Sequence, residues 1–466
     1  MTTRSLGVPG LLISCFCLGL FPPGYAHAQS LEDALTAAYL NNPILLGQRA
    51  RLRATDERVP QALSNWRPSV EITGNAGLSG ITTKGGGTGG STSVGGQHVE
   101  PRSVGVTLTQ PLFRGGRTLA ATSNAENTVR AERARLAKSE QDVLLSAATA
   151  FLDVFRDEAV VKLNINNEQV LKRQLEATRD RFDVGEITRT DVHQASARLA
   201  KAIADRIQAE GDLEASRATY QKIVGMPSAR NLKAPEMPGG LPENQEEALK
   251  AAAVNNPDVV SAEFDKQAQL DAIAEARGEL LPEVNVSTGL TRNLEASIEN
   301  RRVDTAEVKL NLTVPLYQQG AVYSRLREAK QTAAEKLHAI DKARRDSVEA
   351  ATRAWESLAT ARARVKAFKS QIEANVVALE GVEREAQVGS RTVLDVLDAE
   401  QELLDSRVNY VRAQRDEVVA IFQLKAAVGR LTARELKLSA ELYDPTTHYD
   451  EVRDKWFGAT GKGGIE

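Results

Sequence analysis

The segment TQPLFRGG, at residues 109–116, is matched later in the chain by TVPLYQQG, at residues 313–320. Alternating apolar residues precede each segment and predict a β-strand, whereas a long tract without proline follows each segment and predicts a helix. The chain therefore makes the same strand-to-helix transition twice. This repetition indicates a fold that is built from two copies of one unit.

Further matches keep the same order along the chain. They pair Glu32–Leu35 with Glu246–Leu249, Asn41–Pro43 with Asn255–Pro257, Pro68 with Pro282, Val184–Gly185 with Val388–Gly389, and Gly225 with Gly429. We predict a first repeat at 29–225 and a second repeat at 246–430, each with a short helix, two strands, a long helix, a tight turn and a shorter helix. The spacing between matched residues changes once, so the first repeat has the longer loop between its strands. Residues 226–245 contain four prolines and predict a linker, and residues 431–466 form a C-terminal tail.

Residues 1–28 follow the pattern of a secretory signal peptide. An apolar run at 6–21 precedes the small-residue cleavage site Ala26-His27-Ala28. A membrane anchor is one alternative, but the internal proline and glycine argue against it. A lipoprotein cleaved before Cys15 is another, but its apolar run would be very short. Cys15 and Cys17 are the two cysteines of the chain, so the mature protein would contain neither a disulfide nor a reactive thiol.

The tracts 112–226 and 316–444 contain no proline and predict long helical hairpins. A heptad seam in the second tract runs through Leu358, Ala361, Val365, Phe368, Ile372, Leu379 and Val382, and a weaker seam in the first runs through Val129, Leu136, Val143 and Ala150. Residues 117–184 would form a helix of about 100 Å, and the return helix at 188–224 would span about 55 Å. We expect the helix at 44–66 to stack end to end with this return helix and to cover the rest of the long one.

Four segments alternate apolar and polar residues and predict β-strands. Val308, Leu310, Leu312 and Val314 alternate with Lys309, Asn311 and Thr313; Val104, Val106 and Leu108 alternate with Thr107 and Thr109; partner strands begin at Val70 and Ile72 and at Val284 and Val286. One apolar and one polar face suit a small soluble sheet covered by helices or a membrane barrel with a wet lumen. Four strands are too few to close a barrel, whereas three chains would supply twelve. The glycine-rich loop at 85–96 suits the exposed tip of a hairpin.

Composition and motifs argue against catalysis and nucleic-acid binding. The chain has 59 Lys and Arg against 62 Asp and Glu, for a net charge of −3, which excludes a globally basic nucleic-acid-binding protein. Its five histidines lack metal-ligand spacing, and it has no motif for a catalytic nucleophile. Gly85, Gly87 and Gly90 match G-x-G-x-x-G, but no helix is predicted directly after them. We predict no enzymatic activity, no cofactor and no metal site.

Two matching turns, VGEITRTDV at 184–192 and VGSRTVLDVLDA at 388–399, connect the predicted long and return helices. Each has a glycine just past a helix end and a Thr-x-x-Asp capping box at the start of the next helix. Asp395 and Asp398 lie three residues apart and share one helical face. They can form part of a solvated face. If three chains surround an axis, the same carboxylates instead form two rings that attract cations at the narrow end of a duct.

The duplicated Asn-Asn-Pro segments, the strand ends QPLFRGG and VPLYQQG and the two V-G-x-x-T turns resemble the TolC family of outer-membrane channel proteins. The resemblance covers nearly the whole mature chain, and the Asp-Val-Leu-Asp-Ala segment at 395–399 is specific to it. The tail, from Tyr443-Asp444-Pro445 to Trp456 and Phe457, is similar to the type I secretion branch of that family. The resemblance implies an α+β fold that is mainly α. It also implies a homotrimer with a twelve-stranded β-barrel, four strands per chain, continuous with a long α-helical coiled-coil barrel.

The same resemblance implies a function, a location and partners. The chain would be a passive export duct in the cell outer membrane, with a tunnel that extends into the periplasm. It would serve a tripartite efflux or type I secretion system and would be opened by a periplasmic adaptor (membrane fusion protein) and an inner-membrane ABC or proton-driven pump. A periplasmic adaptor or coiled-coil scaffold is the alternative, but adaptors usually carry one hairpin between β-domains, whereas this chain has two hairpins in tandem.

The resemblance also assigns roles to residues of the two turns. Asp395 and Asp398 match the aspartates that ring the periplasmic entrance. Arg391 matches the arginine that ties the inner hairpin to its neighbour in the closed state, through positions that match Thr190 and Asp191. Gly185, Thr188, Gly389 and Thr392 match the tips that the adaptor meets. Ala386 stands where some members have a tyrosine, which implies that one closing link is missing and that the closed state is held less tightly.

Overall fold

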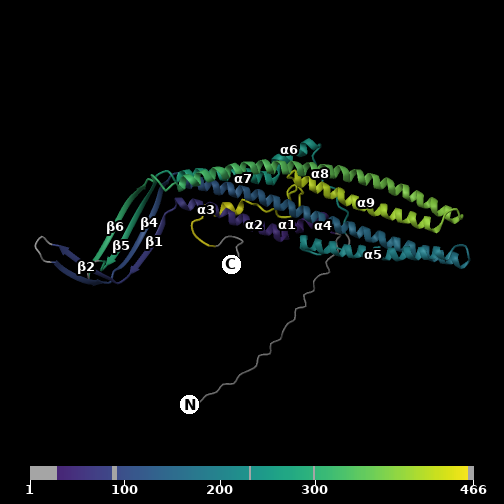
Figure 1. The fold of residues 1–466 in the computed structure, drawn as a ribbon, viewed down its shortest axis with the longest axis horizontal. Coiled ribbons are helices and arrows are strands. Elements are labelled where there is room, and N and C mark those ends of the chain that lie inside the picture. Colours follow the sequence, from purple (N-terminus) through teal and green to yellow (C-terminus); the bar gives the residue numbers. More distant parts are fainter. Residues whose placement is uncertain (1–28, 87–91, 230–231, 297–299, 460–466) are drawn as a thin grey trace, which may run out of the picture.

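The computed structural model describes residues 29–86, 92–229, 232–296 and 300–459. The molecule is elongated, with a β-sheet at one end, a long helical body in the middle and two helical turns at the other end (Figure 1). The predicted signal peptide at 1–28 and part of the glycine-rich loop, 87–91, lie outside the described residues. None of the described helices combines the length and apolarity that crossing a membrane requires.

The elements follow the same order in both halves of the chain. The first half contains α1 (Leu31–Asn41), α2 (Pro43–Asp56), α3 (Arg58–Leu63), the 3₁₀ helix η1 (Ser64–Trp66), β1 (Ser69–Ala76), β2 (Ser79–Gly86), β3 (Thr92–Val99), β4 (Arg102–Arg114), α4 (Arg117–Asp183) and α5 (Arg189–Val224). The second half contains α6 (Gln245–Asn255), α7 (Pro257–Gly278), β5 (Glu283–Leu294), β6 (Arg302–Thr313), α8 (Ala321–Gln387) and α9 (Val393–Ala427), and the tail adds α10 (Thr447–Val452). The predicted duplication and the mainly helical fold are confirmed.

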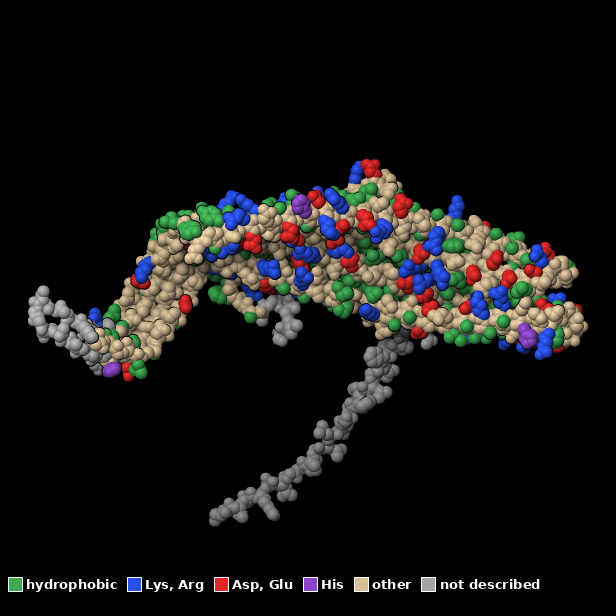
Figure 2. All heavy atoms as spheres, in the orientation of Figure 1, with side chains coloured by type: hydrophobic (Ala, Val, Ile, Leu, Met, Phe, Trp, Pro, Cys, Tyr) green, Lys and Arg blue, Asp and Glu red, His purple; other side chains and the backbone are tan. Residues whose placement is uncertain are grey.

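The main sheet has four antiparallel strands in the order β1-β4-β5-β6. Its register places the predicted apolar residues on one face, since Val70 lies opposite Leu108, Ile72 opposite Val106, Val106 opposite Leu290, and Leu310 opposite Val286. Helices meet the sheet at its base rather than across this face, so Leu310 is 70% exposed in the single chain. Charged side chains are dense over the helical body and sparse over the sheet (Figure 2).

The longer loop of the first repeat contains two strands that were not predicted. β2 and β3 pair antiparallel as a separate two-stranded sheet beyond the ends of β1 and β4. Their sequences are rich in glycine and lack the alternation of apolar and polar residues that signals a half-buried strand. The prediction of four strands therefore holds for the main sheet, and β2 and β3 add a hairpin to it.

The long helices α4 and α8 each contain 67 residues, which corresponds to about 100 Å. The predicted seam of α8 faces α9: Leu358 and Ala361 are each 4% exposed, and the seam residues beyond them are half-buried. The seam residues of α4, from Val129 to Ala150, are buried. The predicted seam packing is thus confirmed for α8 against α9, whereas the seam of α4 is buried in the core with residues of α1, α2 and the end of α5.

The helix predicted at 44–66 is divided in the structure into α2, α3 and η1. Pro60 explains the interruption, because proline has no N–H with which to bond the carbonyl of Asp56 four residues earlier. The expected end-to-end stacking is present. α2 continues the line of α5 along α4, and α7 continues the line of α9 between α4 and α8 (Figure 1).

An asparagine joins the two helices at each of these junctions. Asn42 accepts the N–H of Ile44, at the start of α2, and donates its amide to the carbonyl of Ile223, near the end of α5, both at 2.9 Å. Asn256 likewise accepts the N–H of Asp258 (2.9 Å) and donates to the carbonyl of Ala427 (3.1 Å). One side chain thus satisfies an N–H at one helix end and a carbonyl at another, which are groups that a helix leaves unpaired.

Backbone contact at the second junction is close enough to require glycine. Gly429 has φ of +80°, and a Cβ at this position would lie 2.5 Å from the carbonyl oxygen of Asn255. Both the left-handed conformation and the space exclude a larger residue. The matched Asn-Asn-Pro and glycine positions of the repeat therefore serve one purpose, which is to bring two helix ends together.

We predict that Asn256→Asp lowers the free energy of unfolding by about 1–3 kcal/mol, because the carboxylate leaves the buried carbonyl of Ala427 without a donor. Chemical denaturation followed by circular dichroism measures the change. The matched control is Asn255→Asp, the same substitution at the exposed preceding residue, which should change stability by less than about 0.5 kcal/mol. Equal losses in the two variants would contradict the joining role of Asn256.

Candidate functional site: the helical tips and the polar network behind them

The two helical hairpins end in turns of the same design. After α4, Gly185 adopts φ of +81°, its N–H donates to the carbonyl of Phe182, and the N–H of Glu186 donates to the carbonyl of Arg181, both at 2.9 Å. The second turn has the same pair of bonds, from Gly389 to Ala386 (3.2 Å) and from Ser390 to Glu385 (3.0 Å). This is the Schellman arrangement, in which a left-handed glycine lets the chain reverse while carbonyls at the helix end stay paired.

A capping box opens the helix after each turn, as predicted. Asp191 accepts the N–H (2.9 Å) and the hydroxyl (2.7 Å) of Thr188, whose Oγ1 accepts the N–H of Asp191 at 3.4 Å. Thr392 and Asp395 repeat these bonds at 2.9, 2.8 and 3.2 Å. The N–H and hydroxyl of Thr392 hold the pKa of Asp395 below its usual range, so this carboxylate stays ionised at neutral pH.

Asp398 lies one helical turn beyond Asp395 and has a partner in its own chain. It forms an ion pair with Arg198 of α5, in which the Asp398 side chain is 54% exposed and the Arg198 side chain 29% exposed. The pair joins the return helices of the two hairpins. Beside it, Val393 and Leu397 of α9 are buried in a small apolar cluster with residues of α4 and α5.

Arg391 bonds within its own turn in the single chain. Its Nε donates to Oε2 of Glu385 at 2.9 Å, and this contact raises the pKa of Arg391. Among the described residues, no hydrogen bond or ion pair joins Arg391 to Thr190 or Asp191. The contact expected from the family resemblance, which ties this hairpin to its neighbour in the closed state, stays a prediction.

Two exposed valines at the tips were matched in the repeat but were given no role from the sequence. Val184 is 73% exposed and Val388 is 81% exposed. Each precedes the turn glycine, and a Cβ at Gly185 or Gly389 would have no atom within 4 Å. The two tips therefore present the same small apolar surface on an open backbone. The repetition of Val-Gly in both turns was the sequence signal for it.

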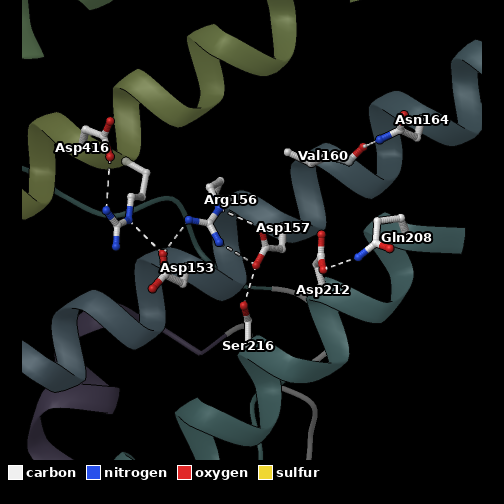
Figure 3. A network of polar contacts seen from close by, with 10 residues as sticks. Asp153, Arg156, Asp157, Val160, Asn164, Gln208, Asp212, Ser216 and Asp416 are labelled. Atoms are coloured by element: carbon white, nitrogen blue, oxygen red, sulfur yellow. Dashed lines mark hydrogen bonds and ion pairs between the residues drawn. The ribbon is translucent and has the colours of Figure 1, made fainter. Parts of the chain in front are cut away.

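Closer to the junctions than to the tips, a continuous polar network links all four helices of the two hairpins. On α4, Nη1 of Arg156 donates to Asp153 at 2.8 Å, while its Nε and Nη2 donate to both oxygens of Asp157 at 2.7 and 2.9 Å (Figure 3). Ser216 of α5 donates to Asp157 at 2.5 Å. Arg415 of α9 donates to Asp153 at 2.9 Å.

The network extends through Asp416 to the fourth helix. Asp416 accepts Nη1 of Arg415 at 3.1 Å and Nη1 of Arg364, on α8, at 3.2 Å. The hydrogen bonds that Arg156 donates to Asp157 raise the pKa of Arg156, and Asp157 is 7% exposed. The sequence carried a signal that was missed, because Asp153, Arg156 and Asp157 interrupt the most apolar stretch of α4.

No catalytic or metal-binding arrangement accompanies these residues. In the described part of the chain, no group of three or more His, Cys, Asp or Glu side chains could hold a metal ion. The tips and the network contain capped helix ends and ion pairs between helices. Such contacts position helices and can be exchanged for other polar contacts, which suits a movable assembly rather than a reaction centre.

Comparisons with known proteins identify what the chain resembles. The model of the family described as "Outer membrane efflux protein" matches residues 34–226 and 248–430. The outer membrane efflux protein BepC of Brucella suis biovar 1 is 33% identical over 435 residues, which are 93% of this chain and 92% of BepC. The outer membrane protein TolC of Vibrio cholerae serotype O1 is 24% identical over 417 residues, which are 88% of this chain and 92% of TolC.

A solved structure extends the likeness to the fold. The CmeC outer membrane channel of Campylobacter jejuni superimposes with a TM-score of 0.72, at 16% identity, over 97% of this chain and 98% of CmeC. The two segments that match the family model correspond to the two copies of the repeat.

We predict that Arg415→Gln lowers the free energy of unfolding by about 2 kcal/mol, because it removes charge-assisted hydrogen bonds to Asp153 and Asp416. Thermal and chemical denaturation measure the loss. Arg412→Gln is the control, since it makes the same change on an exposed side chain of the same helix and should have little effect. Similar stabilities for the two variants would show that the network does not hold the hairpins together.

Proposed function

The chain belongs to the outer membrane efflux protein family, and from this premise we propose that three copies of it form a passive export duct through the outer membrane and into the periplasm. Members of this family are channel proteins of the outer membrane, and the chain is accordingly a non-enzymatic transport protein. The main supporting observation is the four-stranded sheet, whose apolar face none of the described helices covers and whose outer strands, β1 and β6, have no further strand paired to them in the described residues.

These open edges support a closed assembly of several copies. An unpaired strand edge exposes a row of N–H and carbonyl groups, which are costly to leave without partners in lipid. Pairing β6 of one copy with β1 of the next satisfies both edges. Three copies would then give twelve strands, enough for a barrel whose apolar face meets lipid and whose polar face lines a wet lumen.

The helices support a tunnel in line with this barrel. α4 and α8 begin at the base of the sheet and run about 100 Å away from it, which is longer than a bilayer is thick. Several apolar residues of α8, including Leu337 (49% exposed) and Val377 (70% exposed), are exposed in the single chain. Neighbouring copies of the hairpins would cover them in a helical barrel.

We assign the narrow end of the tunnel to the helical tips. Asp395 and Asp398 would form two rings of carboxylates around the axis. In the closed state Arg391 would exchange Glu385 for Thr190 and Asp191 of a neighbouring chain. Both side chains of the Arg391–Glu385 pair are about half exposed (51% and 52%), so this exchange costs little. Ala386 removes one further link at this end.

The exposed turns are the proposed contacts for partner proteins. Gly185, Thr188, Gly389 and Thr392 shape two equivalent tips, and the adjacent valines give each tip an apolar patch. A periplasmic adaptor would dock there and connect the duct to an inner-membrane ABC or proton-driven pump, which supplies the energy. Opening would be an outward movement of the α8–α9 hairpin.

Planar-bilayer recordings test the duct and its aperture together. We expect the purified protein to conduct, with a preference for cations that Asp395→Ala combined with Asp398→Ala weakens. Arg198→Gln should strengthen the preference for cations, because it removes the positive charge that pairs with Asp398. A soluble, non-conducting protein would contradict the duct and favour a periplasmic scaffold. Conductance that is insensitive to all three substitutions would remove these aspartates from the aperture.

A second set of recordings tests the closed state. Arg391→Ser should raise the conductance of the resting channel, because the tips lose their link to the neighbouring hairpin. Arg384→Ser is the matched control: this exposed arginine, in the last turn of α8, pairs with Glu380 of that helix. It should leave the resting conductance unchanged. An equal effect of both substitutions would argue for a general loss of positive charge rather than a specific link.

A further inference from the structure

The described part of the C-terminal tail carries two exposed aromatic side chains that the proposed duct leaves without a role. Trp456 is 58% exposed and Phe457 is 87% exposed, and their ring centroids lie 6.5 Å apart at an interplanar angle of 46°. Large aromatic groups rarely stay in water when they are held together in one place. Their position in the molecule indicates what covers them.

The tail is held against the first helices by contacts that advance in step. The N–H of Tyr443 donates to the hydroxyl of Tyr39 at 3.0 Å, and Nδ1 of His448 lies 3.1 Å from Oδ2 of the fully buried Asp56. Further on, Arg453 pairs with Glu126 of α4 at 3.1 Å. Successive tail residues thus contact α1, then the end of α2, and then the part of α4 nearest the sheet. The tail therefore runs along α2 and α3 toward the sheet (Figure 1).

The last of these contacts places the aromatic pair at the base of the first strand. Nη1 of Arg67 donates to the carbonyl of Lys455 at 2.7 Å, and its guanidinium lies 4.9 Å from the centre of the Trp456 ring. Arg67 precedes β1, which begins at Ser69, by two residues. At about 3.3 Å per extended residue, the backbone of Arg67 lies within roughly 7 Å of the first residue of β1.

Other exposed apolar groups lie at the same end of the sheet. Phe113, near the end of β4, is 44% exposed, and Leu316 and Tyr317, just after β6, are 90% and 76% exposed. Figure 2 shows hydrophobic side chains gathered where the sheet meets the helices. Trp456 and Phe457 therefore continue a belt of aromatic and apolar side chains around the base of the sheet.

We propose that Trp456 and Phe457 are a lipid anchor that fixes the C-terminal tail in the headgroup region of the leaflet on the helical side of the outer membrane. This inference rests on the proposed function, which puts the apolar face of the sheet in lipid. The headgroup region extends about 5–8 Å beyond the hydrocarbon core, which matches the distance of Arg67 from the strand. Tryptophan partitions to this region, and the adjacent guanidinium suits lipid phosphates.

Single-tryptophan variants of the full chain test the anchor. Trp66→Phe with Trp355→Phe leaves Trp456 as the one tryptophan, whose emission is excited selectively at the red edge of its absorption. The protein is reconstituted into phospholipid vesicles with bromine on the lipid chain, either near the headgroup or near the chain end. We expect brominated lipid to quench Trp456, more strongly when the bromine is near the headgroup. The control retains only Trp355, a half-buried residue of α8 that packs against the cluster around α6 and α9, and should not be quenched.

The outcomes separate this inference from the function on which it rests. Protein that floats with the vesicles while Trp456 remains unquenched overturns the anchor and leaves the duct intact. Protection from both lipid and aqueous quenchers would assign the patch to a neighbouring copy and also overturn the anchor. Protein that fails to float overturns both proposals. Trp456→Ala with Phe457→Ala should melt like the wild type in detergent but lose part of the stability that vesicles add.

Discussion

A helix of 67 residues cannot be covered by a return helix of 35 or 36 residues, and the rest of this structure follows from that mismatch. About half of each long helix would remain uncovered, because both partners rise by the same distance per residue. The chain fills the gap with α2 on one side and α7 on the other. Each must meet a return helix end to end, where unpaired backbone groups of both helices face each other. Asn42 and Asn256 satisfy groups on both sides of these junctions, because an amide both donates and accepts.

The same junctions determine where the other parts of the molecule can lie. The apolar core is widest around α1, α2 and the ends of α5 and α9, and the start of the tail packs into it through Leu431, Ala433 and Leu438. From there the tail can reach the sheet only along α2 and α3, where successive contacts hold it. The sheet lies beyond the helices that could have covered its apolar face, so that face requires lipid or another protein.

The repeat, the helical hairpins and the face of each strand could be predicted from the sequence, because each depends on local periodicity. The heptad seam that includes Leu358 predicts a helix packed against another helix, and the alternation around Leu310 predicts a strand with one apolar face. The Thr-x-x-Asp pattern predicts a capped helix start. The division of 44–66 followed from Pro60 and could have been predicted. β2 and β3 could not, since their pairing uses backbone groups that every sequence has.

The contacts between helices were beyond local patterns. Arg198 and Asp398 are 200 residues apart, and their meeting depends on the rotation of α5 and α9 about their axes. The network that joins Arg364, Asp416 and Asp153 depends in the same way on the mutual positions of α8, α9 and α4. Its charged residues could be noticed in an apolar stretch, but their partners could not be named.

The hairpins are held by two kinds of contact, and the difference decides which end can move. Around the junctions the packing is apolar and close, and separating it would open cavities. Toward the tips a small apolar cluster is supplemented by ion pairs such as Arg198–Asp398 and Arg391–Glu385, which are partly exposed. Water or another chain can replace either partner of such a pair at small net cost. A displacement that keeps the junctions packed and exchanges polar partners at the tips is therefore the least costly movement open to the α8–α9 hairpin.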